Sequence, residues 1–159
     1  MDILALLGDY TNILTALNND KILVGRTNFE DVNFNDDLIV IDTLINTPIG
    51  KSKSYDGDLE IMTYTTKYRG IFTFDFYGSS SLTLANMFIA RIQSQDGREF
   101  ARDNKIEINL NSSLVNVANI QGVTIYDRYQ IEIMVKYSEQ YSESILRIDT
   151  AQIANIDTN

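Results

Sequence analysis

Asp75 and Glu132 are two residues whose type and position could support acid–base chemistry. Asp75 lies in a predicted strand, on the side opposite three phenylalanines, and Glu132 lies on the opposite side of its own strand from Tyr129 and Ile131. Two carboxylates that face each other across a cleft can act as general acid and general base. Nothing in the sequence brings these two together, and solvated faces of sheets routinely carry such residues. We therefore do not expect this pair to make the protein an enzyme.

Gly50-Lys-Ser52 follows a predicted strand and is similar to the end of a phosphate-binding loop. That motif also needs a glycine five residues earlier, where this chain has Ile45. It further needs a helix that begins at the Lys-Ser pair, because the N-terminus of that helix receives the phosphates. A turn at Tyr55–Asp58 follows instead, so we interpret Lys51 as an exposed loop lysine.

Asp31–Asp37 carries oxygen-bearing side chains at the spacing of the first half of a calcium-binding loop. The sixth position of such a loop should be glycine but is Asp36, and the twelfth should be glutamate but is Asp42. We interpret the segment as a surface turn rich in Asp and Asn. The sequence therefore predicts no catalytic residue, no cofactor and no metal site.

Composition narrows the possible functions further. The chain of 159 residues contains no cysteine, histidine or tryptophan, which excludes disulfides, thiolate metal sites and Ser-His or Cys-His catalysis. Its net charge is −9, and tight binding to DNA or RNA needs a basic face. No apolar run approaches the roughly 20 residues of a membrane helix, and the N-terminus lacks the basic region of a secretory signal. We expect a protein of the reducing cytosol or of a particle assembled there.

The stretch that organises the rest of the chain is Tyr68–Gln93. Phe72, Phe74 and Phe76 alternate with polar or mixed residues, which predicts a strand with one apolar face. Gly78 ends the strand, and the hydroxyls of three following serines are expected to cap a helix. That helix would cover the phenylalanine face, and its predicted core residues are Leu82, Ala85, Phe88, Ile89 and Ile92.

Several flanking segments complete the first half of the predicted fold. Asp2–Leu17 has apolar residues at helical spacing; it could bind a partner, but we expect it to pack on the protein's own sheet. Lys21–Asp37 is predicted to be a polar connection, and Leu38–Ile45 a buried central strand. Asn46–Asp58 contains the single proline and is predicted to be an exposed loop. Leu59–Thr66 is expected to form a hairpin with the Tyr68–Tyr77 strand, with the turn at Thr66-Lys67.

The second half of the chain predicts mainly strands. Val123–Tyr137 is the longest of them, with Tyr129, Ile131, Ile133, Val135 and Tyr137 on one face. Residues 144–159 are predicted to be an edge strand or an arm that adds to a neighbour's sheet. The remaining segments are a helix-ending turn at Gln95–Gly97, a charged stretch at Arg98–Asn104, and short strands within Lys105–Leu110 and Leu114–Ile120.

Together these segments predict an α+β fold over residues 1–159 as a single domain. Its sheet would be mixed but mainly antiparallel, with an N-terminal helix and a central helix packed on it. The strands are also rich in tyrosine, which suits both surfaces buried on assembly and ordinary sheets. The tyrosines in question are Tyr64, Tyr68, Tyr77, Tyr126, Tyr129, Tyr137 and Tyr141.

The order of these segments resembles the neck or tail-terminator proteins of tailed bacteriophages. The likeness begins with a strand closing in an aromatic–glycine pair, Arg69–Gly78, and a helix rich in Leu and Ala, Leu82–Arg91. It continues through Val115–Ile120, Tyr126–Tyr137 and a terminal Ile153–Ile156. In the long strand, a charged and aromatic element resembles that of the family and comprises Arg128, Tyr129, Glu132 and Tyr137.

The resemblance implies a structural virion protein, assembled in the host cytoplasm, that acts by shape. Its copies would form a closed ring, usually described as a hexamer, that caps the tail tube and joins it to the head connector. Its expected partners are its own copies and the proteins of the tail tube, the sheath or the head connector. DNA would be only a passing cargo in an acidic lumen, and no membrane is involved. The alternatives are a head-closure protein, a baseplate component, or a small protein-binding module with a peptide on its sheet edge.

Overall fold

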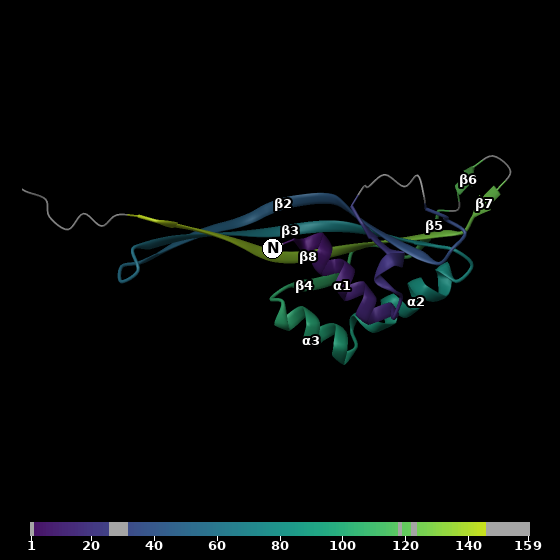
Figure 1. Ribbon diagram of the computed structural model, residues 1–159, viewed down its shortest axis with the longest axis horizontal. Helices are drawn as coiled ribbons and strands as arrows, with labels where there is room; N and C mark the ends of the chain where they lie inside the picture. The colour runs from purple at the N-terminus through teal and green to yellow at the C-terminus, as the bar shows by residue number, and fades with distance from the viewer. Residues whose placement is uncertain (1, 26–31, 118, 122–123, 146–159) are drawn as a thin grey trace, which may run out of the picture.

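The computed structural model describes residues 2–25, 32–117, 119–121 and 124–145, in which three helices pack on one face of a long sheet (Figure 1). The helices are α1 (Ile3–Thr15), α2 (Ser81–Ile92) and α3 (Gln95–Asp103). A short 3-10 turn, Asn19–Lys21, follows α1. Beyond the helices the sheet continues as a long ribbon, which Figure 1 shows extending to the left.

The main sheet has the strand order β1-β2-β3-β8-β4, with β5 also pairing with β8. Among the strand pairs of the described residues only β1–β2 is parallel, so the predicted mixed but mainly antiparallel α+β fold is confirmed. A separate antiparallel pair joins β6 and β7. The strands are β1 (Ile22–Val24), β2 (Leu38–Asp56), β3 (Ile61–Tyr77), β4 (Glu107–Leu110), β5 (Val115–Asn116), β6 (Asn119–Gln121), β7 (Thr124–Tyr126) and β8 (Arg128–Ser144).

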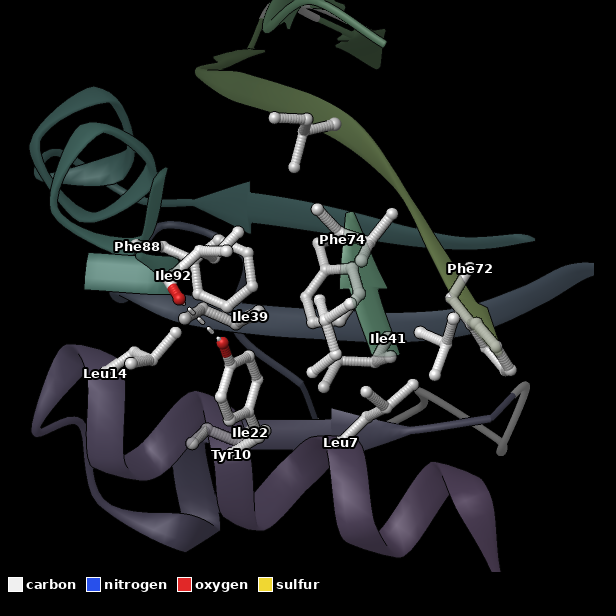
Figure 2. Packing of buried hydrophobic residues seen from close by; sticks show 14 of the residues in the cluster. Leu7, Tyr10, Leu14, Ile22, Ile39, Ile41, Phe72, Phe74, Phe88 and Ile92 are labelled. Atoms are coloured by element: carbon white, nitrogen blue, oxygen red, sulfur yellow. Dashed lines mark hydrogen bonds between the residues drawn. The ribbon is translucent and has the colours of Figure 1, made fainter. Parts of the chain in front are cut away.

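The core is built on the phenylalanine face of β3, as the alternating pattern predicts. Phe72, Phe74 and Phe76 are fully buried, and the ring of Phe88 from α2 lies 4.9 Å from Phe74 (Figure 2) and 5.7 Å from Phe76. On β8, the predicted inward face is also confirmed, with Ile131, Ile133 and Val135 buried against the same cluster. Burying a side chain of this size contributes roughly 1.5–3 kcal/mol each, so this face holds the helices to the sheet.

Helix α1 begins at the predicted cap and packs on the protein's own sheet. The Asp2 carboxylate accepts hydrogen bonds from the backbone N–H groups of Leu4 and Ala5, at 3.1 and 3.2 Å. Such a cap satisfies backbone donors that the first helical turn leaves open. Leu7, Tyr10 and Leu14 are buried in the core (Figure 2), so the apolar stripe of this helix is already covered.

The start of α2 differs from the prediction in two ways. No serine hydroxyl caps the helix; instead the Asp37 carboxylate accepts a hydrogen bond from the Ser80 N–H at 2.8 Å. Gly78 adopts φ +94°, and a Cβ there would lie only 2.6 Å from the Asp36 carbonyl oxygen. Leu82 is 45% exposed, so its predicted core position is wrong. The buried face comprises Ser81, Leu84, Ala85, Phe88 and Ile92, with Ile89 partly buried beside it.

The predicted loop over Asn46–Asp58 is wrong, because β2 continues without a break to Asp56. Its register against β3 shifts between Pro48 and Gly50, which marks an irregularity of the bulge type. Proline lacks a backbone N–H and is tolerated on edge strands and at bulges. The proline that suggested a loop therefore sits where a strand can accept one.

The hairpin turn lies at the far end of the ribbon and not at the predicted Thr66-Lys67. Strand β3 runs without interruption from Ile61 to Tyr77, and Thr66 and Lys67 face β2 and β8 in register. The chain reverses just after Asp56, whose carboxylate accepts the N–H groups of Asp58 and Leu59. An aspartate in this position forms a local turn with its own following backbone.

Further differences concern the segments around the core. The predicted turn at Gln95–Gly97 and the charged stretch after it form α3, whose N-terminal Ser94 hydroxyl accepts the Gly97 N–H at 3.2 Å. A Cβ on Gly97 would lie 2.7 Å from the Arg91 and Ile92 carbonyl oxygens, so glycine permits this close approach. The predicted connection Lys21–Asp37 contains β1.

For the second half of the chain, some predicted strands are found and other predictions stay untested. Lys105–Leu110 does contain a strand, β4, and Leu114–Ile120 contains β5 and the start of β6. Ser144 ends β8, but residues 146–159 lie outside the described residues. The edge strand or neighbour-binding segment predicted for residues 144–159, and the single-domain organisation of the chain, therefore stay predictions.

Replacing Phe88 with alanine should destabilise the protein by about 3–5 kcal/mol, because it removes the ring that packs on Phe74, Phe76 and Tyr10. Leu82→Ala, on the same helix but exposed, should change the free energy of unfolding by less than about 0.5 kcal/mol. Urea unfolding followed by circular dichroism measures both values. Equal effects of the two substitutions would contradict this description of the core.

Tyr10 predicts a loss of stability at alkaline pH. Burial raises the pKa of its phenol to about 12, whereas in the unfolded chain the pKa is about 10. Between these values the folded protein keeps a proton that the unfolded chain loses. The free energy of unfolding should therefore fall by up to about 1.4 kcal/mol per pH unit from pH 10 to 12.

Tyr10→Phe is the matched control, because the hydroxyl makes only a long hydrogen bond of 3.4 Å to the Ile92 carbonyl (Figure 2). At pH 8 the variant should be close to the original protein in stability. Between pH 10 and 12 its free energy of unfolding should fall less steeply. Identical slopes for the two proteins would show that this phenol is not the titrating group.

Candidate interaction surface

The most prominent feature outside the core is a three-stranded ribbon, here called the arm. It comprises residues 46–56 of β2, 61–69 of β3 and 137–144 of β8. In Figure 1 it leaves the helices behind and extends away from them. Most of its side chains are exposed, in contrast to the other half of the same strands. A sheet without a covering layer presents its surface to other molecules.

Tyrosine pairs line the helix-side face of the arm. Tyr68 on β3 stacks on Tyr137 of β8 at 5.3 Å, and farther out Tyr64 lies 6.4 Å from Tyr141. The Tyr64 hydroxyl also donates a hydrogen bond of 2.8 Å to Glu143. Aromatic pairs across adjacent strands stabilise a sheet by roughly 0.2–1 kcal/mol each. They therefore help the arm to hold its shape without a core of its own.

The part of the sheet that the helices cover is here called the body. One hydrogen bond ties the three strands together where the arm meets the body. The Asn46 amide on β2 donates to the Tyr137 hydroxyl on β8 at 2.7 Å, and Gly70 of β3 lies opposite both Asn46 and Val135. A Cβ on Gly70 would lie 2.5 Å from the Phe72 ring, so this position has no room for one. Burial raises the pKa of Tyr137, although the hydrogen bond from Asn46 opposes that shift.

Both long edges of the arm are open within the described part of the chain. Strand β1 pairs only with Ile39–Ile41 of β2, and β4 pairs only with Ile133–Lys136 of β8. Along the arm itself, residues 46–56 of β2 and 137–144 of β8, the outer sides have no partner strand among residues 2–25, 32–117, 119–121 and 124–145. An open edge offers unpaired backbone N–H and C=O groups to another strand.

Exposed apolar side chains gather on β2 near the root of the arm. Leu44, Ile45 and Ile49 are each about half exposed, which is unusual for three large aliphatic residues within six positions. Apolar residues clustered at an exposed sheet edge mark surfaces that become buried on association. This root of β2 is therefore part of the same candidate interface as the arm.

The structure places Asp75 and Glu132 on the same face of the sheet but gives each its own partner. Asp75 is 6% exposed and makes two contacts of 3.1 Å with the Arg128 guanidinium. Burial raises the pKa of Asp75, although Arg128 opposes that shift. Glu132 accepts a hydrogen bond of 2.8 Å from the Asn111 amide. The two carboxylates thus hold strands and a loop in place.

The other candidate motifs also have structural roles. Lys51 lies inside β2, so no helix begins at the Lys-Ser pair to receive phosphates. Asp36 forms an ion pair with Lys21 at 3.1 Å, and Asp37 caps α2, while Asp31 lies outside the described residues. Among the residues that the structure describes, no group of three or more Asp, Glu, His or Cys is arranged to hold a metal ion.

A hollow of 410 Å³ lies where the arm leaves the body. It is lined by the stacked Tyr68 and Tyr137 and by Ile106. Lys136 and Glu107 also line it and form an ion pair of 3.0 Å. The hydrogen bond from Lys136 lowers the pKa of Glu107, so this carboxylate is held in its ionised form. The hollow is an indentation beside the arm and belongs to the same surface.

The arm is the candidate interaction element that sequence reasoning missed. Its signal was present, because Lys51, Lys53 and Tyr55 alternate with Ser52 and Ser54. That period of two is typical of a strand, but one without an apolar face. The polar composition and the proline favoured a loop instead.

One protein-family model matches the chain along its whole length. The family model described as "Phage neck terminator protein" matches residues 1–159. No curated protein matches the chain. In the described segments, no helix has the length and apolar character needed to cross a membrane.

Tyr137→Phe tests the tie at the root of the arm. Losing the hydroxyl removes the hydrogen bond from Asn46 and should lower the free energy of unfolding by about 0.5–1.5 kcal/mol. Tyr141→Phe, at a tyrosine that is 65% exposed, is the matched control and should be neutral. Hydrogen exchange should also quicken in β2 beyond Asn46 for the first variant alone. Unchanged exchange there would contradict a fastening role.

Proposed function

The chain belongs to the phage neck terminator protein family, and from this premise we propose that its copies form a closed ring of six that caps the tail tube. Membership makes it a structural protein of the phage neck, with its place in the virion and its partners among the tail and head proteins. The ring, its copy number and its docking are the proposal.

The arm is the observation that carries the proposal. It exposes two open strand edges and, at its root, the three aliphatic side chains of Leu44, Ile45 and Ile49. These features are a contact surface, whereas the candidate catalytic carboxylates are engaged in structural contacts. Contacts between unlike surfaces of identical subunits close into a ring when each step turns by the same fraction of a circle.

The mechanism is geometric. A ring whose symmetry matches that of the tube occupies the tube's growing end and stops further subunits from adding. Its opposite side then presents a new surface, to which the connector of the head docks. The protein would thereby set where the tail ends and hold that end to the head.

DNA passes such a ring as cargo and is not bound by it. The chain carries 22 acidic and 13 basic residues, for a net charge of −9. A duplex is retained by basic side chains that release its counterions. An acidic lumen repels the phosphates and lets the genome slide through.

Shortening the arm should abolish tail capping without unfolding the body. Gly50 and Lys67 face each other across β2 and β3, so residues 51–66 can be replaced by an Asn-Gly turn between them. In a phage that lacks its own copy of the gene, this variant should leave tails unjoined to heads or of irregular length. Electron microscopy of the lysate and counts of infectious particles measure the effect.

Leu59→Ser is the matched control, because Leu59 is at the tip and 66% exposed but the substitution leaves the arm at full length. It should support normal yields, and both variants should unfold cooperatively on heating. A normal yield of joined particles from the shortened protein would overturn the proposal. So would a ring found at the baseplate or inside the head rather than at the tail end.

A further inference from the structure

The two open edges of the arm carry opposite charges on the same face. Lys51 and Lys53 lie on β2, and Glu139 and Glu143 lie on β8. Register places all four on the helix-side face, since Lys51 is opposite Thr66, which is opposite Glu139. Side chains of directly opposed residues in a sheet point to the same side. The arm is therefore positive along one edge and negative along the other.

These charges do not neutralise each other within one copy. The middle strand β3 separates the two rows, and two strand spacings amount to about 10 Å. Neither Lys51 nor Lys53 forms an ion pair with any described residue. Both lysines and Glu143 are exposed, and Glu139 is partly so. The opposite rows are thus available to another molecule.

The other face of the same edges carries no charged side chain beside these lysines and glutamates. On β2 it presents Ser52 and Ser54, and on β8 it presents Ser138, Gln140 and Ser142. Small or uncharged polar side chains place no repulsion between two strands brought together there. Each face of the β2 edge is therefore compatible with the corresponding face of the β8 edge.

We propose that the open edge of β2 in one copy pairs with the open edge of β8 in the next copy, with Lys51 and Lys53 beside Glu139 and Glu143. The proposal rests on the ring and names the contact that builds it. Strands β2 and β8 are both antiparallel to β3 and so run in the same direction. One step of a sixfold ring turns a strand by at most about 60°, so the new pair runs in the parallel sense.

The charge pattern also selects against the wrong contacts. Two β2 edges placed together would oppose lysine to lysine, and two β8 edges would oppose glutamate to glutamate. Like charges directly opposite each other in a sheet are destabilising. A symmetric dimer through either edge is disfavoured, and the unlike pairing that remains is the kind that closes into rings.

Charge reversal tests the pairing. Reversing one edge, as Lys51→Glu with Lys53→Glu or as Glu139→Lys with Glu143→Lys, should shift the protein from the mass of a ring to that of an 18.1 kDa subunit. Combining all four substitutions restores opposite charges and should restore the ring. Light scattering on the purified proteins measures each mass, and thermal unfolding checks that each variant folds.

Lys67→Glu with Arg69→Glu is the matched control. It changes the net charge by the same amount as reversal of the β2 edge, but both residues are exposed on the central strand β3. This variant should keep the ring. Loss of the ring in the control, or rings of normal mass after reversal of a single edge, would overturn the proposal. So would a variant with all four substitutions that keeps the mass of a single subunit.

A cysteine pair locates the contact inside the particle. The chain has no cysteine, so Lys51→Cys with Glu139→Cys introduces the only thiols. Within one copy their Cα atoms are about 10 Å apart, beyond the roughly 7 Å that a disulfide spans. Between copies paired as proposed they are neighbours, so oxidised virions should yield a ladder of linked chains up to the full ring.

Each single cysteine variant should give no ladder, because one thiol per chain links at most two copies. The outcome separates this proposal from the proposed function. Intact capped tails without a ladder would overturn the edge pairing and leave the capping role standing. Virions with one copy at the neck, or with uncapped tails in the presence of the protein, would overturn both.

Discussion

Continuous pairing of β3 with β2 on one side and β8 on the other is the constraint on which the rest of the structure depends. In the body, β3 turns Phe72, Phe74 and Phe76 into the core, where the helices bury them. In the arm, the same strand separates two edges and holds them in register. Because one strand serves both parts, the direction of the arm is fixed by the packing of the body. Local ties at its root, such as Asn46 to Tyr137, reinforce that connection.

Function follows from what this arrangement leaves open. The apolar face of the sheet is buried under the helices, and the buried Asp75 forms an ion pair with Arg128. What remains for other molecules is backbone on two edges, aliphatic side chains at the root of β2 and an asymmetric distribution of charge. The proposed joining of copies rests on these features. They agree with membership in a family of structural neck proteins.

How much the sequence predicts depends on whether a segment has an apolar face. Alternation at Phe72–Phe76 and Ile131–Val135, and helical spacing in Asp2–Leu17, placed the core correctly because burial imposes those periods. The arm was missed because β2 beyond Asn46 is held by pairing with a neighbouring strand and not by burial, so its residues need only be compatible with a strand. The cap of α2 was missed for a similar reason, since Asp37, which holds the start of this helix, lies 43 residues away in the chain.

The central claim is that this protein works by joining its own copies through the arm. The measurement that tests it most directly is electron cryo-microscopy of the neck in intact virions, at a resolution that separates strands. The account predicts a closed ring in which β2 of each copy lies beside β8 of the next, with the strands parallel. Arms that stand apart, or a neck that contains one isolated copy, would contradict it.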